Sequence, residues 1–159
     1  MDNIEKFDQY VADIFNRLYS TFPRRIEISS ADLLGVEPGE NFRPEPGGNN
    51  VVPYYFKGTQ KIAKVSTEDW KLAIDTIRWL IDSGFILGQI KDDRRGVGLT
   101  LSHKGLELLK MVPSSLNITI GEKLTEAVKA GAMDVAKEII KKGLTNIGLL
   151  YQLVNLISR

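Results

Sequence analysis

The chain has 159 residues, of which 43% are hydrophobic and 26% are charged, and these ordinary globular values argue against wholesale disorder and against a multi-span membrane protein. Its 21 Lys and Arg residues against 20 Asp and Glu residues leave a net charge of +1, which argues against a strongly basic nucleic-acid coat protein. The absence of cysteine excludes disulfides and thiolate metal sites, and a single histidine excludes a multi-histidine metal site within one chain.

The first predicted element is an amphipathic helix that ends before Pro23. Its apolar residues recur at helical spacing, at Ile4, Phe7, Val11, Ile14 and Leu18. Acidic residues near its start suit the positive end of the helix dipole. The N-terminal segment is charged and lacks the apolar run of a secretory signal, so we expect a cytoplasmic protein.

A short strand is predicted at residues 26–28, and the serine-x-x-acid pattern from Ser29 to Asp32 predicts the start of a short helix that ends at Gly35. Prolines, glycines and asparagines then dominate the sequence GVEPGENFRPEPGGNNVVP. Because such residues break helices and central strands, residues 36–62 are predicted to be an inserted loop. Its aromatic run at residues 54–56 is expected to anchor the far end of the loop against the core.

The strongest helix prediction starts at the capping pattern Ser66 to Asp69, runs through Asp82 and ends at Gly84. Two strands at residues 85–90 and 97–101, joined by a charged turn, then predict a β-hairpin. Ser102 caps a further helix that stops at Pro113.

The last third of the chain predicts two helices. A capping box at residues 119–122 opens the first, whose stripe of Leu124, Val128, Gly131, Val135 and Ile139 continues to Lys142. Gly143 is interpreted as a stop or hinge. The final helix follows in a run of sixteen residues, 143–158, without a charged side chain.

This order of elements, and the segment WLIDSGFILGQIKDDRRGVGLTLSHKGLELL at residues 79–109 above all, resembles the winged helix-turn-helix superfamily. The resemblance covers roughly residues 1–112. It implies an α+β fold, mostly α, in which residues 36–62 are inserted where the family has a tight turn. Residues 113–159 would be a helical tail for oligomerisation or docking.

In DNA-binding members of the superfamily the third helix enters the major groove and the wing approaches the backbone. The resemblance therefore implies DNA contacts from Lys64, Thr67, Lys71, Arg78, Lys91, Arg94 and Arg95. Residues 66–113, however, carry seven acidic and seven basic side chains. Because such binding typically neutralises about 6–10 phosphates, one protomer is expected to bind double-stranded DNA weakly, and a dimer would double the footprint.

We expect the tail to form a homo-oligomer through close helix packing at small residues and through the apolar final helix. The residues predicted for this contact are Gly131, Val135, Ile139, Leu144, Ile147, Leu150, Tyr151 and Val154. The alternative is docking within the chain or on a protein partner. A membrane surface is the less favoured alternative: the uncharged run is shorter than the about 20 residues of a spanning helix, but lysines precede it.

No nucleophile constellation or carboxylate pair stands out, so the sequence predicts no enzyme, no cofactor and no metal site. His103 is interpreted as a surface or packing histidine, and the glycines at 96 and 98 as hairpin residues rather than a phosphate loop. The sequence thus favours a dimeric DNA-binding regulator, with a winged-helix protein-interaction scaffold as the alternative.

Overall fold

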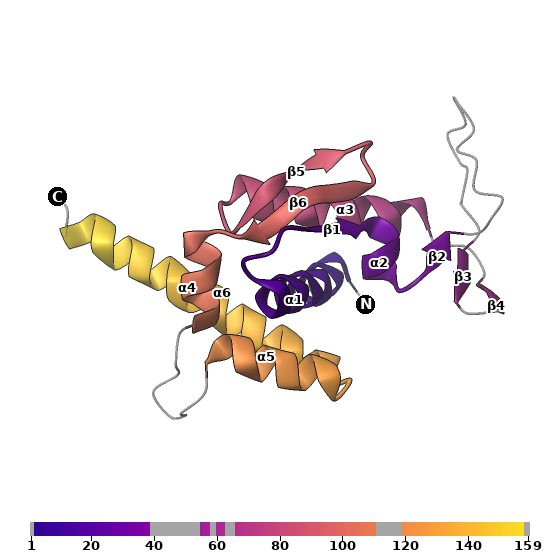
Figure 1. Ribbon diagram of the computed structural model, residues 1–159. Helices are drawn as coiled ribbons and strands as arrows, with labels where there is room; N and C mark the ends of the chain where they lie inside the picture. The colour runs from indigo at the N-terminus through magenta and orange to yellow at the C-terminus, as the bar shows by residue number, and fades with distance from the viewer. Residues whose placement is uncertain (1, 39–54, 58–59, 63–65, 111–118, 158–159) are drawn as a thin grey trace.

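The computed structural model describes residues 2–38, 55–57, 60–62, 66–110 and 119–157. The protein is α+β and mostly helical, with two small antiparallel sheets (Figure 1). The predicted class is therefore confirmed. Most of the predicted helices and the hairpin are present, and the differences lie in their bounds.

Helix α1 (Asn3–Thr21) lies at the centre of the molecule, where it contacts α3, α5 and α6. Its start has a capping box in which Asp2 and Glu5 bond each other's backbone amides. The buried surface is wider than the predicted stripe, and comprises Asp8, Tyr10, Val11, Ala12, Ile14, Phe15 and Leu18. Ile4, predicted to belong to that stripe, lies in the first turn of α1 and is 65% exposed, so the buried stripe begins after it.

The main sheet has the strand order β1-β6-β5, with all neighbours antiparallel. Strand β1 (Ile26–Ser29) leads directly into α2 (Ser30–Leu34), while β5 (Ile86–Lys91) and β6 (Arg95–Leu101) form the predicted hairpin. The strands reach closer to the turn than predicted, because Asp92 and Asp93 take positive φ angles of 56° and 49° and reverse the chain tightly.

Helix α3 (Thr67–Asp82) packs between α1, α2 and the hairpin, and α4 (His103–Lys110) follows β6. Both starts are capped as predicted, since Ser66 accepts the amide of Asp69 and Ser102 accepts the amide of Gly105. Gly84, at a φ of 79°, ends α3 and turns the chain into β5.

The predicted loop at residues 36–62 contains strands where the structure describes it, so that prediction is wrong in part. Strands β2 (Glu37–Pro38), β3 (Tyr55–Lys57) and β4 (Gln60–Ile62) form a second sheet in the order β2-β3-β4. Proline lacks a backbone N–H and therefore cannot complete the hydrogen bonds of a long central strand. The short strands at a sheet edge need fewer of these bonds and can form near prolines. Residues 39–54 and 58–59 lie outside the described part of the chain.

The tail forms α5 (Ile120–Lys129) and α6 (Met133–Ile157), and here the predicted helix bounds are wrong. The expected single helix breaks at Gly131, whose φ of 70° is left-handed and lets Ala132 donate its amide back to Ala127. Gly143 does not stop α6. A Cβ atom there would lie 2.9 Å from Leu108 Cδ1, so this glycine permits close approach of α6 to α4.

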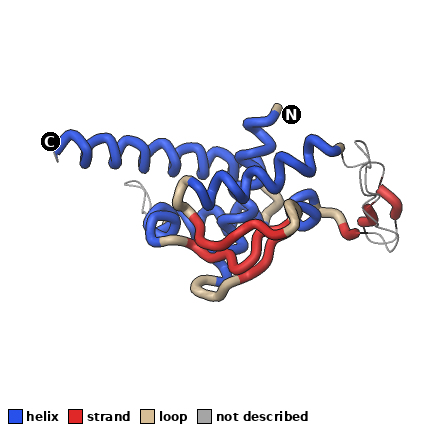
Figure 2. Tube along the Cα trace, turned by 90° about the horizontal axis from the view of Figure 1, so that it is seen from above, coloured by secondary structure: helices blue, strands red, loops and turns tan. Residues whose placement is uncertain are grey.

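One core joins all these helices to the main sheet. Ile120 and Leu124 of α5, and Ala136 and Ile140 of α6, belong to the same buried cluster as α1, α3 and α4. The first part of the tail thus packs within the chain. Figures 1 and 2 show the C-terminal half of α6 projecting beyond this packed body.

We expect Gly105→Ala to destabilise the protein by about 1–3 kcal/mol, because a Cβ atom at this position would lie 2.2 Å from the carbonyl oxygen of Phe85. Urea unfolding measures the loss. Glu107→Ala, at an exposed position of the same helix, is the control and should change stability by less than about 0.5 kcal/mol. An unchanged unfolding midpoint for Gly105→Ala would contradict the tight contact between α4 and the start of β5.

Candidate functional site

The cations predicted for DNA contact gather around α3 and the β5–β6 hairpin, although not all fall within the described part. Lys64 lies outside the described residues, and Thr67 is the first residue of α3, with its side chain outside the described part. Lys71 and Lys91 are exposed. Lys91, Arg94 and Arg95 border the hairpin turn, and Arg78 reaches it from α3.

Arg78 bridges α3 to the hairpin through two carboxylates. One guanidinium nitrogen bonds Asp75 on the same helix, and the other lies 3.1 Å from Asp93 in the turn. Exposed ion pairs of this kind contribute only about 0–1 kcal/mol each, so a phosphate can displace them. The displaced carboxylates would remain beside that phosphate and repel it.

Arg95 is paired in the same way, with Glu27 of β1 at 3.0 Å and with Asp92 of the turn at 3.6 Å. The backbone at Arg94 is also engaged: its carbonyl accepts the amide of Ser30 at 2.9 Å. This hydrogen bond holds the hairpin turn against the start of α2. Because β1 pairs with β6 up to Arg95, the hairpin ends level with its neighbouring strand.

A carboxylate also lies at the start of α3. Lys6 donates to Asp69 at 2.6 Å, and this hydrogen bond lowers the pKa of Asp69 below its ordinary value. Asp69 therefore stays ionised at neutral pH, close to the helix start where a phosphate would bind. Together with the paired arginines, it makes the surface around α3 one of mixed charge.

Four of the eight predicted oligomerisation residues are fully described by the structure, and these four differ in exposure. Gly131 lies in the exposed turn before α6, and Val135 is 53% exposed. Ile139 and Leu144 are half-buried and pack against the core. Ile147, Leu150, Tyr151 and Val154 belong to α6, and their side chains lie outside the described part of the chain.

The contact that seats α6 on α1 includes a buried charge cluster that the sequence prediction missed. Asp8 is 4% exposed, and its Oδ2 atom lies 3.6 Å from Lys141 Nζ without a hydrogen-bond partner. Lys137, 9% exposed, lies near the same carboxylate and pairs with Asp134 at 3.3 Å. The signal was Asp8 itself, an acid that lies at helical spacing between apolar residues of α1.

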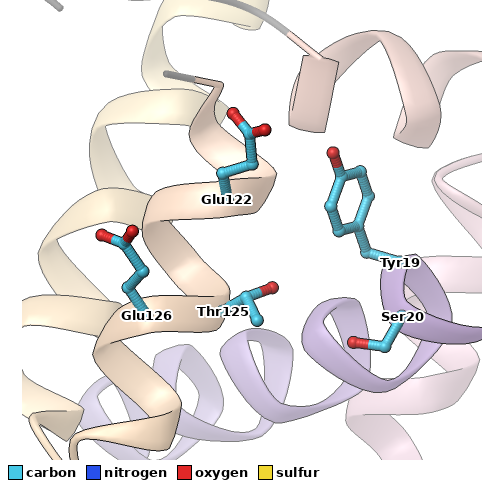
Figure 3. Close-up of a pocket in the computed structure, with 5 residues that line it drawn as sticks. All are labelled: Tyr19, Ser20, Glu122, Thr125 and Glu126. Carbon is cyan, nitrogen blue, oxygen red and sulfur yellow. The ribbon is translucent and has the colours of Figure 1, made fainter. Parts of the chain in front are cut away.

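A shallow pocket of about 330 Å³ lies between α1 and α5 (Figure 3). Tyr19 and Ser20 line it from α1, and Glu122, Thr125 and Glu126 line it from α5. Most of the polar side chains that line it form hydrogen bonds with the backbone of their own helix. The Glu122 carboxylate accepts the amide of Thr119, and the hydroxyls of Ser20 and Thr125 donate to carbonyls one turn earlier. The pocket lining holds no nucleophile paired with a base.

The remaining candidate sites in the described part of the chain also lack a catalytic or metal-binding arrangement. His103 is exposed and lies 2.9 Å from Glu107 on the same helix. Among the described residues no cluster of three or more potential metal ligands is found. Within the same part of the chain, none of the helices combines the length and the apolar character that a bilayer crossing requires.

Asp8 generates a pH prediction. Burial raises its pKa above the ordinary 3.8, in spite of Lys141, so the fold favours the protonated acid. We expect the stability of the wild type relative to Asp8→Asn to fall as the pH rises from about 3 through this raised pKa. Urea unfolding at several pH values up to about 6 measures the difference, with Asp134→Asn as an exposed control beside the same lysine cluster. If the wild type instead gained stability relative to Asp8→Asn as the pH rose, the raised pKa of the Asp8 carboxyl would be contradicted.

No family model matches the chain, and neither a curated protein nor a solved structure matches it. Function is therefore inferred from the charges around α3 and the hairpin and from the course of α6.

Proposed function

We propose that the protein is a non-enzymatic winged-helix interaction module that self-associates through the distal segment of α6, residues 145–157. The observation that carries this proposal is the course of α6. Its first part belongs to the core, whereas the distal segment leaves the packed body in both views (Figures 1 and 2).

The element order supports the winged-helix assignment. Helix α1, strand β1, helices α2 and α3 and the hairpin β5–β6 follow one another, and β1 pairs beside the hairpin in a three-stranded sheet. Residues 37–62 are inserted between α2 and α3. Where the structure describes this insertion, its strands β2, β3 and β4 form the second sheet at one end of the molecule, away from α6 (Figure 1).

The composition of the distal segment supports self-association. Residues 145–157 include no charged side chain, and most of their polar or small members recur at spacings of three and four, at Thr145, Gly148, Gln152 and Asn155, with Asn146 outside this stripe. A helix with so narrow a polar stripe is normally covered on most of its circumference. Over about 20 Å of helix, each apolar side chain that becomes buried contributes about 1.5–3 kcal/mol.

The surface around α3 supports a protein partner over a nucleic acid. Arg78 and Arg95 each bond carboxylates, and the hairpin turn rests on α2 instead of extending from the sheet. Mixed charge of this kind suits a protein surface, whereas DNA binding needs a net excess of cations.

We expect the double substitution Leu150→Asp with Val154→Asp to convert a dimer to a monomer, because it places two charges on the apolar side of the distal segment. Gln152→Asp with Asn155→Asp adds the same charge on the polar stripe and should leave the dimer intact. Sedimentation velocity over a range of concentrations measures both. A wild-type chain that is monomeric at all concentrations would refute the proposal.

Duplex DNA is the second candidate partner, and the exposure of Lys71 on α3 and Lys91 on β5 favours it. If these cations meet phosphates, random duplex should bind at low salt and lose affinity steeply as salt rises, and Lys71→Glu with Lys91→Glu should weaken the binding. Lys129→Glu with Lys142→Glu, on α5 and α6, is the charge-matched control. Fluorescence anisotropy with a labelled duplex measures the affinity, and a flat titration at low salt would remove this candidate.

A further inference from the structure

An aromatic cluster is partly exposed where α1 meets the end of α3. Trp79, 44% exposed, lies with its ring centroid 5.2 Å from that of Phe7 in an edge contact and 6.1 Å from that of Phe85 in a stacked one. Ile4, one turn before Phe7 on α1, is 65% exposed. We call these four residues the aromatic patch.

The patch is held rigidly. Lys104 Nζ lies 4.1 Å from the ring centroid of Phe85 and donates to the carbonyl of Ser83 at 2.9 Å. Phe85 itself is buried, and its ring also contacts Phe15 of the core. The exposed indole of Trp79 therefore packs on a buried ring. Aromatic side chains held in this way commonly contribute a large share of the binding free energy in protein interfaces.

Two sets of contacts connect the patch to the part of α6 that precedes the distal segment. On α4, Leu108 packs against Gly143 of α6, and Lys104, one turn earlier on the same side of α4, lies over Phe85. On α1, Asp8 pairs with Lys141 of α6 and directly follows Phe7. The patch and the base of the distal segment are thus connected through both α4 and α1.

We propose that the aromatic patch binds the distal segment of α6 from a second copy of this chain, and that the second copy binds the first in return. This inference rests on the proposed self-association and adds where the contact is made. In an isologous dimer each surface meets its complement on the partner, so the contact closes at two copies.

The geometry of a two-fold axis supports this arrangement. If two distal segments cross in antiparallel fashion, the end of each helix reaches the base of the other, to which the patch is connected through α4 and α1. One symmetric contact would then cover the distal segment and the aromatic patch of each copy. Because residues 143–158 include no charged side chain, this contact buries no charge from the helix on the indole.

A fluorescence experiment on the full chain tests the contact. Trp70→Phe leaves Trp79 as the only tryptophan, because the chain has two. We expect the emission of Trp79 to shift to longer wavelength, and its quenching by iodide to increase, as dilution converts the dimer to monomer. Adding Leu150→Asp and Val154→Asp should produce the monomer spectrum at every concentration.

Ile4→Asp provides a second test that leaves the core untouched, since Ile4 is exposed and an acid suits the first turn of a helix. It should weaken dimerisation by at least about tenfold, as expected for a residue inside an interface. Leu87→Asp, at a comparably exposed apolar position on β5, is the control and should leave the dimer unchanged.

The outcomes separate the two proposals. A dimer in which Trp79 emission is independent of concentration, or in which Ile4→Asp has no effect, overturns this inference and leaves self-association standing. A monomer at all concentrations overturns both. A monomer whose Trp79 is protected only by vesicles of anionic phospholipid shows that the patch faces a membrane, and this also overturns the inference.

Discussion

The fold depends on the burial of α1 on two sides. Residues such as Val11 and Ile14 are fully buried, and so are Ala12 and Phe15 on the adjoining side of the helix. A helix with one apolar stripe needs one neighbour, but α1 contacts α3, α5 and α6. Each large apolar side chain buried on it contributes about 1.5–3 kcal/mol. The helices that follow the hairpin are therefore part of the structural core, up to the point where the distal segment of α6 leaves it (Figure 1).

Ion pairs between arginines and carboxylates make the surface around α3 one of mixed charge. Arg78 and Arg95 are of the residue type that binds phosphate, yet each is bonded to carboxylates across the sheet, the turn or the helix. The ion pairs are individually weak, but they leave acids among the bases. We therefore place recognition on the apolar surfaces, the distal segment of α6 and the aromatic patch, where burial supplies more free energy than exposed charges do.

Local chemistry made several elements predictable. Helix starts at Ser29, Ser66 and Thr119 were predicted from a hydroxyl followed three residues later by an acid, and each makes that capping bond. The hairpin followed from alternation around a charged turn. The break at Gly131 and the continuity of α6 through Gly143 were not predictable, because a glycine can end a helix or admit a neighbouring one. Packing against Leu108 decided the second case.

The sequence by itself determined the α+β class, the capped helix starts, the hairpin and the uncharged character of the final segment, because each depends on neighbours within a few residues. Only the tertiary structure decided which cations are paired, that Asp8 is buried opposite Lys141, and that Trp79 is exposed between Phe7 and Phe85. These properties join residues far apart in the chain, and their energies depend on distance and burial, which the order of residues alone does not specify.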